Sequence, residues 1–152
     1  MNQIEVTVTG TIRRPLAEVS RQFGDVRHHA ANRVHPKLTF TILEERGESV
    51  HFRQQVSLVG MKQVDEIVQT RRPDSSLYSE IVDGTNKGSR LTQTFAPEGG
   101  DATRITLTFR MPATGVKRLL KPLFAAAIRK TVVDALEEDR FDLEVRGYRP
   151  AA

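Results

Sequence analysis

Several residue types are absent or scarce in this chain of 152 residues. It contains no cysteine, which excludes disulfide bonds, thiolate nucleophiles, and zinc or iron–sulfur sites built on cysteine. Tryptophan is also absent, and aromatic residues make up only 6% of the sequence. No apolar run approaches the roughly 20 residues that span a bilayer, and the first residues lack the basic and apolar regions of a secretory signal. We therefore expect a soluble, cytoplasmic protein.

Motifs for nucleotide binding and for serine hydrolysis are missing as well. The chain has no Gly-x-Gly-x-x-Gly or Walker sequence, which would cradle phosphates, and no Gly-x-Ser-x-Gly elbow, which would expose a nucleophilic serine. We expect no cofactor.

The charge is mildly basic, with 23 Lys and Arg residues against 19 Asp and Glu residues. The basic residues occur in scattered pairs with acidic residues between them, and none lies in a block interleaved with aromatic residues for base stacking. We therefore expect no nucleic-acid partner. The length predicts one domain over residues 1–152, large enough to bury a core.

Hydrophobic periodicity predicts a strand first and then helix. Apolar residues alternate with polar ones from Ile4 to Ile12, which is typical of a half-buried strand. Pro15 then suits the first turn of a helix, and Gly24 ends the helical spacing that follows it. Residues 25–36 fit either a second short helix or a loop.

Alternation returns at residue 37 and predicts six further strands. Turn residues separate them at 46–48, Gly60, 73–74, 84–88 and 97–101. Such short connections make successive strands antiparallel neighbours. After Pro112 the spacing becomes helical up to Leu143, and Pro122 predicts a break between a short leading turn and a long helix.

The predicted fold is therefore α+β, with a seven-stranded curved antiparallel sheet wrapped around one long C-terminal helix. One helix covers only part of the apolar face of such a sheet. The remainder predicts a cavity between sheet and helix, of the largely apolar kind that binds small molecules.

Three segments resemble the helix-grip superfamily, which includes START lipid-transfer domains, birch-pollen-allergen proteins and polyketide cyclase/dehydrase-like proteins. The first is the start of the predicted helix at residues 14–19. The second is the sequence of strands and turn at residues 88–106, in which a Pro/Gly stretch precedes Thr-Arg-Ile-Thr. The third is the helix at residues 115–146, which starts with a Leu-Leu pair. The resemblance covers nearly the whole chain. It implies a ligand pocket without specifying the ligand, because family members include enzymes, carriers and regulatory binders.

Residues 26–36 depart from the family pattern. Many bacterial members carry a Trp-Pro-x-Trp-type segment there, whereas this chain has Val-Arg-His-His-Ala-Ala-Asn-Arg-Val-His-Pro. The segment holds His28, His29 and His35, whose roles could be metal ligand, general base, pocket lining, or exposed and capping residues. His28 and His29 are adjacent and so diverge on a helix or a strand. We favour exposed or capping histidines and expect no metal site.

Polar residues on apolar strand faces are candidates for the pocket. Gln54 shares a face with Phe52, and Gln93 shares one with Leu91; each amide either lines the pocket or lies in solvent at a strand end or bulge. The expected ligand-binding residues are Phe52, Gln54, Tyr78, Leu91, Gln93, Phe109, Phe124 and Ile128.

The fifth predicted strand is ambiguous. Either Leu77, Ser79 and Ile81 or their neighbours Tyr78 and Glu80 face inward. In the second case Tyr78 and Glu80 would form an acid/base pair.

The start of the long helix places Lys117, Arg118 and Lys121 beside Leu119, Leu120 and Leu123. This pattern indicates either an ordinary solvated basic face or a transient contact with an anionic membrane or ligand head group.

The sequence favours a protein that binds or carries a small hydrophobic or amphipathic molecule, such as a lipid, a quinone or an aromatic polyketide-like compound. The alternative is a cyclase or dehydratase acting on an aromatic or polyketide-like substrate, with Tyr78, Glu80 or a histidine of residues 28–35 as acid/base.

Overall fold

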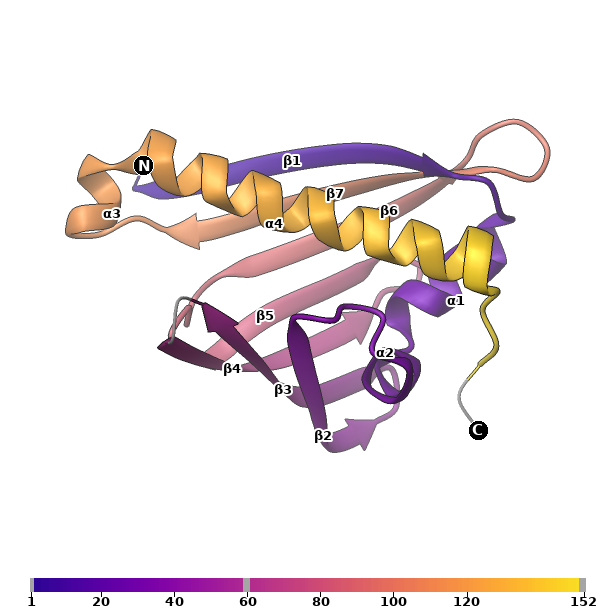
Figure 1. Cartoon of the computed structure of the whole chain (residues 1–152), viewed down its shortest axis with the longest axis horizontal. Helices are drawn as coiled ribbons and strands as arrows, with labels where there is room; N and C mark the ends of the chain where they lie inside the picture. The colour runs from indigo at the N-terminus through magenta and orange to yellow at the C-terminus, as the bar shows by residue number, and fades with distance from the viewer. Residues whose placement is uncertain (1, 59–60, 151–152) are drawn as a thin grey trace.

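The computed structural model describes residues 2–58 and 61–150 and places seven strands in one antiparallel sheet, in the order β1-β7-β6-β5-β4-β3-β2 (Figure 1). The strands are β1 (Gln3–Ile12), β2 (Leu38–Arg46), β3 (Ser49–Leu58), β4 (Met61–Arg71), β5 (Leu77–Gly84), β6 (Arg90–Pro97) and β7 (Thr103–Pro112). The helices are α1 (Leu16–Gly24), α2 (Val26–Asn32), α3 (Val116–Leu119) and α4 (Lys121–Phe141), followed by the π-helical turn η1 (Asp142–Arg146). The predicted helix-grip architecture is confirmed. The turn predicted at Gly60 lies outside the described residues.

Two short helices follow β1 because the local sequence stops and restarts the helix. Pro15 precedes α1 with extended backbone, and Gly24 is its last residue. The side chain of Asp25 then accepts a hydrogen bond from the backbone N–H of His28 at 3.0 Å, which caps α2. Arg33, with φ of 48°, ends α2 in the left-handed conformation. The sequence left residues 25–36 as either a short helix or a loop, and the structure has the helix α2 followed by a loop.

The long helix begins after the predicted break. Leu120 separates α3 from α4, and Pro122 lies in the first turn of α4. Backbone N–H groups in a first turn have no acceptor within the helix, so the N–H that proline lacks costs no helical hydrogen bond there. The helix crosses one side of the sheet and packs against β1 (Figure 1). Leu136 is buried there, whereas Leu119 and Leu123 are 81% and 66% exposed. Among the described residues no helix is long and apolar enough to cross a membrane.

The sheet buries its inner face, which is the face toward α4, in two separate hydrophobic clusters. The main cluster joins β1, β7, α1 and α4, and includes Ile4, Ile105 and Leu143. The second cluster covers the other end of the sheet and comprises Val26, Phe52, Ile67 and Ile81 with Phe40, Ile42 and Val50 packed against them. The central strands between these two clusters carry the polar residues described next.

Candidate functional site

Polar side chains occupy the inner face of the sheet along its central strands. Cross-strand register pairs Gln69 of β4 with Ser79 of β5, and pairs Gln93 of β6 with Leu77 of β5. Leu77 belongs to the main cluster, so its cross-strand partner and Ser79, two positions along, share the inner face. Gln69, Ser79 and Gln93 are 7–8% exposed. The prediction that Gln93 shares the apolar face of Leu91 is confirmed, and its alternative of a solvent-facing amide is wrong.

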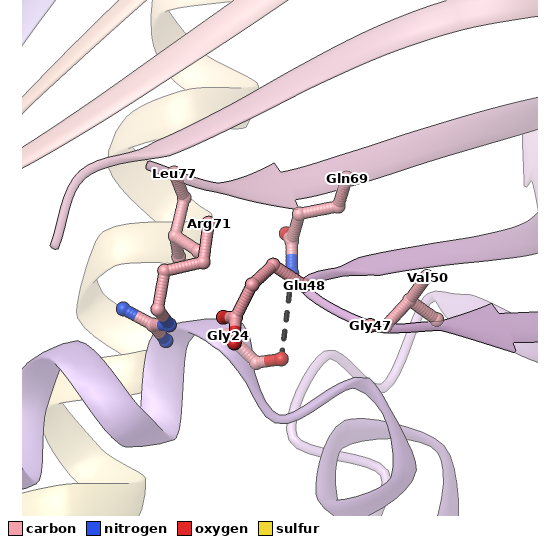
Figure 2. Close-up of a pocket in the computed structure, with 7 residues that line it drawn as sticks. All are labelled: Gly24, Gly47, Glu48, Val50, Gln69, Arg71 and Leu77. Carbon is pink, nitrogen blue, oxygen red and sulfur yellow. Dashed lines mark hydrogen bonds between the residues drawn. The ribbon is translucent and has the colours of Figure 1, made fainter. Parts of the chain in front are cut away.

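Three polar side chains of the inner face have no hydrogen-bonding partner among the described residues of the protein, and one of them is Gln54 of β3. Within the described part of the chain, the side chains of Gln54, Ser79 and Gln93 make no hydrogen bond to protein, and the Gln69 amide donates only a long bond of 3.4 Å to the Gly24 carbonyl (Figure 2). Their polar atoms are not fully buried, since the described side-chain atoms that are both fully buried and unpartnered are Gln22 Oε1, His51 Nε2 and Ser89 Oγ. Water or a bound molecule with polar atoms can therefore supply their hydrogen bonds.

Asp65 is the buried acid of this face, but its oxygens are already engaged. Oδ1 accepts from the backbone N–H of Asn86 and Oδ2 from the Asn86 side-chain amide, both at 2.8 Å. The carboxylate therefore anchors the β5–β6 turn, which is a structural role.

Arg71 lies at the α1 end of the inner face. Its guanidinium donates to Ser20 Oγ at 2.6 Å, to the Ser20 carbonyl at 2.8 Å and to the Ser75 carbonyl at 3.1 Å. Burial lowers the pKa of Arg71 and the charge of Glu48 opposes that shift.

Two cavities adjoin the Arg71 side chain. The first has a volume of about 150 Å³ and is lined by Gly24, Gly47, Glu48, Val50, Gln69, Arg71 and Leu77 (Figure 2). The second has a volume of about 310 Å³ and is lined by Leu16, Ala17, Ser20, Arg21, Arg71 and Ser75. Both lie at the α1 end of the sheet, so the cavity expected between the sheet and the long helix stays a prediction.

The three histidines of residues 28–35 are buried, with 4–8% of each exposed. The expectation that they are exposed or capping residues is therefore wrong. The reason lies in the fold, because α4 and η1 bring carboxylates against α2. His28 Nε2 lies 2.7 Å from Asp142 Oδ2, His29 Nε2 lies 2.8 Å from Asp139 Oδ1, and His35 Nδ1 lies 2.9 Å from Glu138 Oε1.

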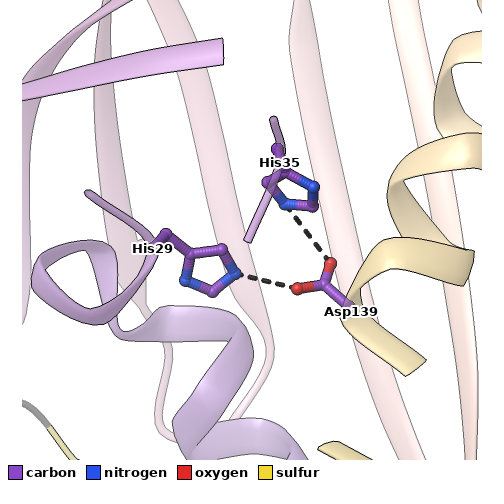
Figure 3. A group of neighbouring side chains, drawn as sticks. All are labelled: His29, His35 and Asp139. Carbon is purple, nitrogen blue, oxygen red and sulfur yellow. Dashed lines mark hydrogen bonds and ion pairs between the residues drawn. The ribbon is translucent and has the colours of Figure 1, made fainter. Parts of the chain in front are cut away.

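His29 and His35 converge on one carboxylate (Figure 3). Nε2 of His35 lies 3.6 Å from Oδ2 of Asp139, opposite the oxygen that faces His29. Nδ1 of His29 donates to the Asp25 carbonyl at 2.8 Å, since a carbonyl only accepts. Gln22, which is fully buried, donates to both Asp139 and Asp142.

The electrostatics of the His29–Asp139 pair favour its ionised form. Burial lowers the pKa of His29, but the hydrogen bond and charge of Asp139 outweigh it and raise that pKa above its ordinary value. Burial likewise raises the pKa of Asp139, yet the charge of His35 and the hydrogen bond from His29 hold it below its usual range.

The predicted site residues lie in three places. Phe52 is buried in the second cluster, and Gln54 follows it on the same face beside Asp65. The remaining inward-facing residues pack at or beside the main cluster, and they are Leu91, Gln93, Phe109, Phe124 and Ile128.

Tyr78 and Glu80 occupy the opposite face of the sheet. On β5 the buried residues are Leu77, Ser79 and Ile81, whereas Glu80 is exposed and the Tyr78 ring lies under the Arg72 guanidinium at 4.4 Å. Of the two alternatives for this strand, the one with Leu77, Ser79 and Ile81 inward is confirmed, and the one with Tyr78 and Glu80 inward is wrong. The physical reason is that Leu77 and Ile81 each complete an apolar cluster that a tyrosine and a glutamate could not fill.

Sequence reasoning missed Gln69, Asp139 and Asp142, and it named Ser79 only as one alternative for the inner face of the fifth strand. The alternation of β4 carried a signal for Gln69, because it lies two residues after Ile67. The helical stripe carried a signal for Asp139, which lies three residues after Leu136 and four before Leu143. A carboxylate on an apolar stripe needs a buried partner.

Comparison with known proteins gives one family and many similar folds. Residues 3–139 match the family model described as polyketide cyclase / dehydrase and lipid transport. No curated protein shows significant sequence similarity to the chain.

Three solved structures illustrate the likeness of fold. The protein TTHA0849 from Thermus thermophilus superposes with a TM-score of 0.79 at 19% identity, over 90% of this chain and 94% of that one. The Zhui aromatase/cyclase from Streptomyces sp. R1128 has a TM-score of 0.75 at 18% identity, over 97% and 99%. A START superfamily protein from Mycobacterium smegmatis has a TM-score of 0.68 at 16% identity, over 94% and 96%. At these identities the likeness shows the fold alone.

Proposed function

Because the chain belongs to the polyketide cyclase/dehydrase and lipid transport family, we propose that it binds a small amphipathic molecule between the central strands and α4. The observation that carries this proposal is the set of unpartnered amides and hydroxyl on an apolar face, namely Gln54, Ser79 and Gln93. Apolar walls with a few fixed polar groups are typical of sites that hold and orient a small molecule.

The ligand chemistry follows from the groups that would meet it. The two clusters supply apolar walls, and Gln69 and Gln93 each supply an amide donor and acceptor. Uncharged, dual-character partners suit carbonyl and hydroxyl oxygens better than a carboxylate or an ammonium group. A quinone or an aromatic polyketide-like compound has such oxygens on an apolar frame.

A steric block on the inner face tests this proposal. We expect Ser79→Phe to lower the affinity for the fluorescent probe 1-anilinonaphthalene-8-sulfonate by at least about tenfold, because the new ring occupies the space that a ligand needs. The matched control is Glu80→Phe, which adds the same ring one residue along on the outer face and should leave affinity unchanged. Equal affinities of the wild type and Ser79→Phe would contradict the proposal.

Native mass spectrometry of the freshly purified protein identifies what the cell supplies. A carrier keeps its ligand through purification, so a small-molecule adduct that disappears on denaturation supports carriage and gives the ligand mass. A cyclase or dehydratase would instead release a changed product. That alternative has lost Tyr78 and Glu80, which face outward, and retains only the histidines of residues 28–35 from its predicted set.

A contact with an anionic membrane is a second proposal, which the exposure of α3 supports. Val116 and Leu119 are 63% and 81% exposed, and Lys117 and Arg118 lie between them. Apolar and basic side chains on one short segment suit the interface of a bilayer that carries anionic lipid.

Vesicle binding tests the membrane contact. We expect co-sedimentation with vesicles of phosphatidylcholine and phosphatidylserine that weakens as salt rises, and that Leu119→Glu abolishes. Leu43→Glu is the control, because Leu43 is also exposed but lies beside Glu44 and Glu45. Salt-independent binding, or equal binding by Leu119→Glu, would contradict the contact.

A further inference from the structure

The cluster of His29, His35 and Asp139 has the composition and the arrangement of a metal centre. The residues come from three segments, namely α2, the loop after it and α4, and all three are buried. One ligand atom from each lies within 4.8 Å of the other two. We propose that these three side chains bind one divalent first-row transition metal ion, such as Zn²⁺.

The distances suit such an ion. Ligand atoms about 2.1 Å from a tetrahedral metal stand about 3.4 Å apart. Nε2 of His29 and of His35 lie 2.8 and 3.6 Å from the two oxygens of Asp139, on either side of that value. The two nitrogens face different oxygens of Asp139 and the three ligand atoms lie within 4.8 Å of one another, so side-chain rotation has to bring the two nitrogens and one oxygen onto a common centre.

The outer hydrogen bonds orient both rings for metal binding. A metal-binding histidine typically donates its second ring N–H to a carbonyl or a carboxylate, which fixes the ring and its tautomer. Nδ1 of His29 lies 2.8 Å from the Asp25 carbonyl, and Nδ1 of His35 lies 2.9 Å from the Glu138 carboxylate. Each ring therefore turns its Nε2 toward Asp139.

Two further contacts support the third ligand and the surroundings. Gln22 donates to Oδ1 of Asp139 at 3.0 Å and holds the carboxylate in place. The Phe40 ring lies edge-on to His29 and His35, with centroids 6.4 and 6.2 Å away, and supplies an apolar wall. Such a shell limits access of water to a bound ion.

His28 is not a ligand of the proposed metal site. It is as buried as His29, but its Nε2 faces Asp142 and its Nδ1 accepts from Asn32 at 3.1 Å. Both ring nitrogens are therefore engaged away from Asp139. The ligand set is two histidines and one carboxylate, which leaves a coordination position for water or for an oxygen of a ligand.

Calorimetric titration of the whole metal-free protein with Zn²⁺ tests the inference. We expect one ion per chain. His35→Gln and Asp139→Asn should each weaken binding by at least about 100-fold, and Glu138→Gln by about 10–100-fold through the orientation of His35. His28→Gln is the matched control, since it removes an equally buried histidine–carboxylate bond and should change the affinity less than about threefold.

The wild type alone provides a second measurement that needs no variant to fold. Addition of Co²⁺ should produce the visible absorption of a low-coordinate nitrogen and oxygen site, and Zn²⁺ should shift the NMR signals of the His29 and His35 ring nitrogens while those of His28 stay fixed. Failure of the wild type to bind one equivalent of Zn²⁺, or binding that persists undiminished in His35→Gln, would overturn the inference and leave a histidine–aspartate ion-pair cluster only.

Discussion

Replacement of Asp142 by alanine should lower the free energy of unfolding by about 3–5 kcal/mol. Asp142 is 2% exposed, and its Oδ2 accepts from His28 Nε2 at 2.7 Å and from the Gln22 amide at 2.9 Å. Alanine would leave both donors buried without an acceptor and would open a cavity where η1 meets α2. Urea unfolding followed by circular dichroism measures the loss.

Two companion variants separate the lost hydrogen bonds from other effects. Asp142→Asn keeps the shape and one acceptor oxygen, so it should be less destabilising than alanine. Asp134→Ala removes a carboxylate whose partner is Lys130 on the exposed side of α4, and its unfolding midpoint should not move measurably. An Asp142→Ala protein as stable as Asp134→Ala would show that the buried network does not hold η1 and α4 against α2.

The order of strands and helices could be predicted because each rests on local signals. Alternation in β1 and β7, turn residues between hairpins and a proline at the break before α4 all act over a few residues. The facing of β5 could not be predicted in this way. Tyr78 and Leu77 both suit a strand, and only the packing of Leu77 into the main cluster and of Ile81 into the second decides which set is buried.

The histidines illustrate the second limit of sequence reasoning. Adjacent histidines diverge on a helix, and His28 and His29 do bond to different aspartates. That argument excludes a shared site for those two alone. It says nothing of His35, which the left-handed turn at Arg33 brings beside His29 with ring centroids 5.2 Å apart. Contacts across more than a hundred residues, such as His29 with Asp139, have no signature in spacing.

The two polar regions are joined by aromatic packing. Phe40 contacts the rings of His29 and His35 on one side and of Phe52 on the other, and Gln54 lies opposite Phe40 in the register. The histidine cluster therefore borders the same end of the inner face as the unpartnered Gln54. A ligand oxygen bound near Gln54 would lie on the side of the sheet that carries the histidines, which connects the proposed ligand site with the proposed metal.

Replacement of Gly84 by alanine should destabilise the protein by about 2–5 kcal/mol. Gly84 has φ of +108°, and a Cβ there would lie 2.2 Å from the Val64 carbonyl oxygen and 2.7 Å from the Asp65 Cα, which are backbone atoms. Because Asp65 anchors Asn86, the shift that relieves this contact would also displace a buried carboxylate of the inner face. Thermal unfolding and binding of the naphthalene sulfonate probe should therefore both change.

Gly47 provides the matched control for this backbone effect. Its φ is +57°, but a Cβ there would meet nothing within 4 Å, so Gly47→Ala should cost only the left-handed conformation, about 1–2 kcal/mol. Gly47→Ala should leave Asp65 and Asn86 in place, and the two variants are compared by unfolding because Gly47 lines the smaller cavity. Equal losses in the two variants would mean that the strands relax around the new methyl group at Gly84, and that the Asp65–Asn86 turn does not set the geometry of the inner face.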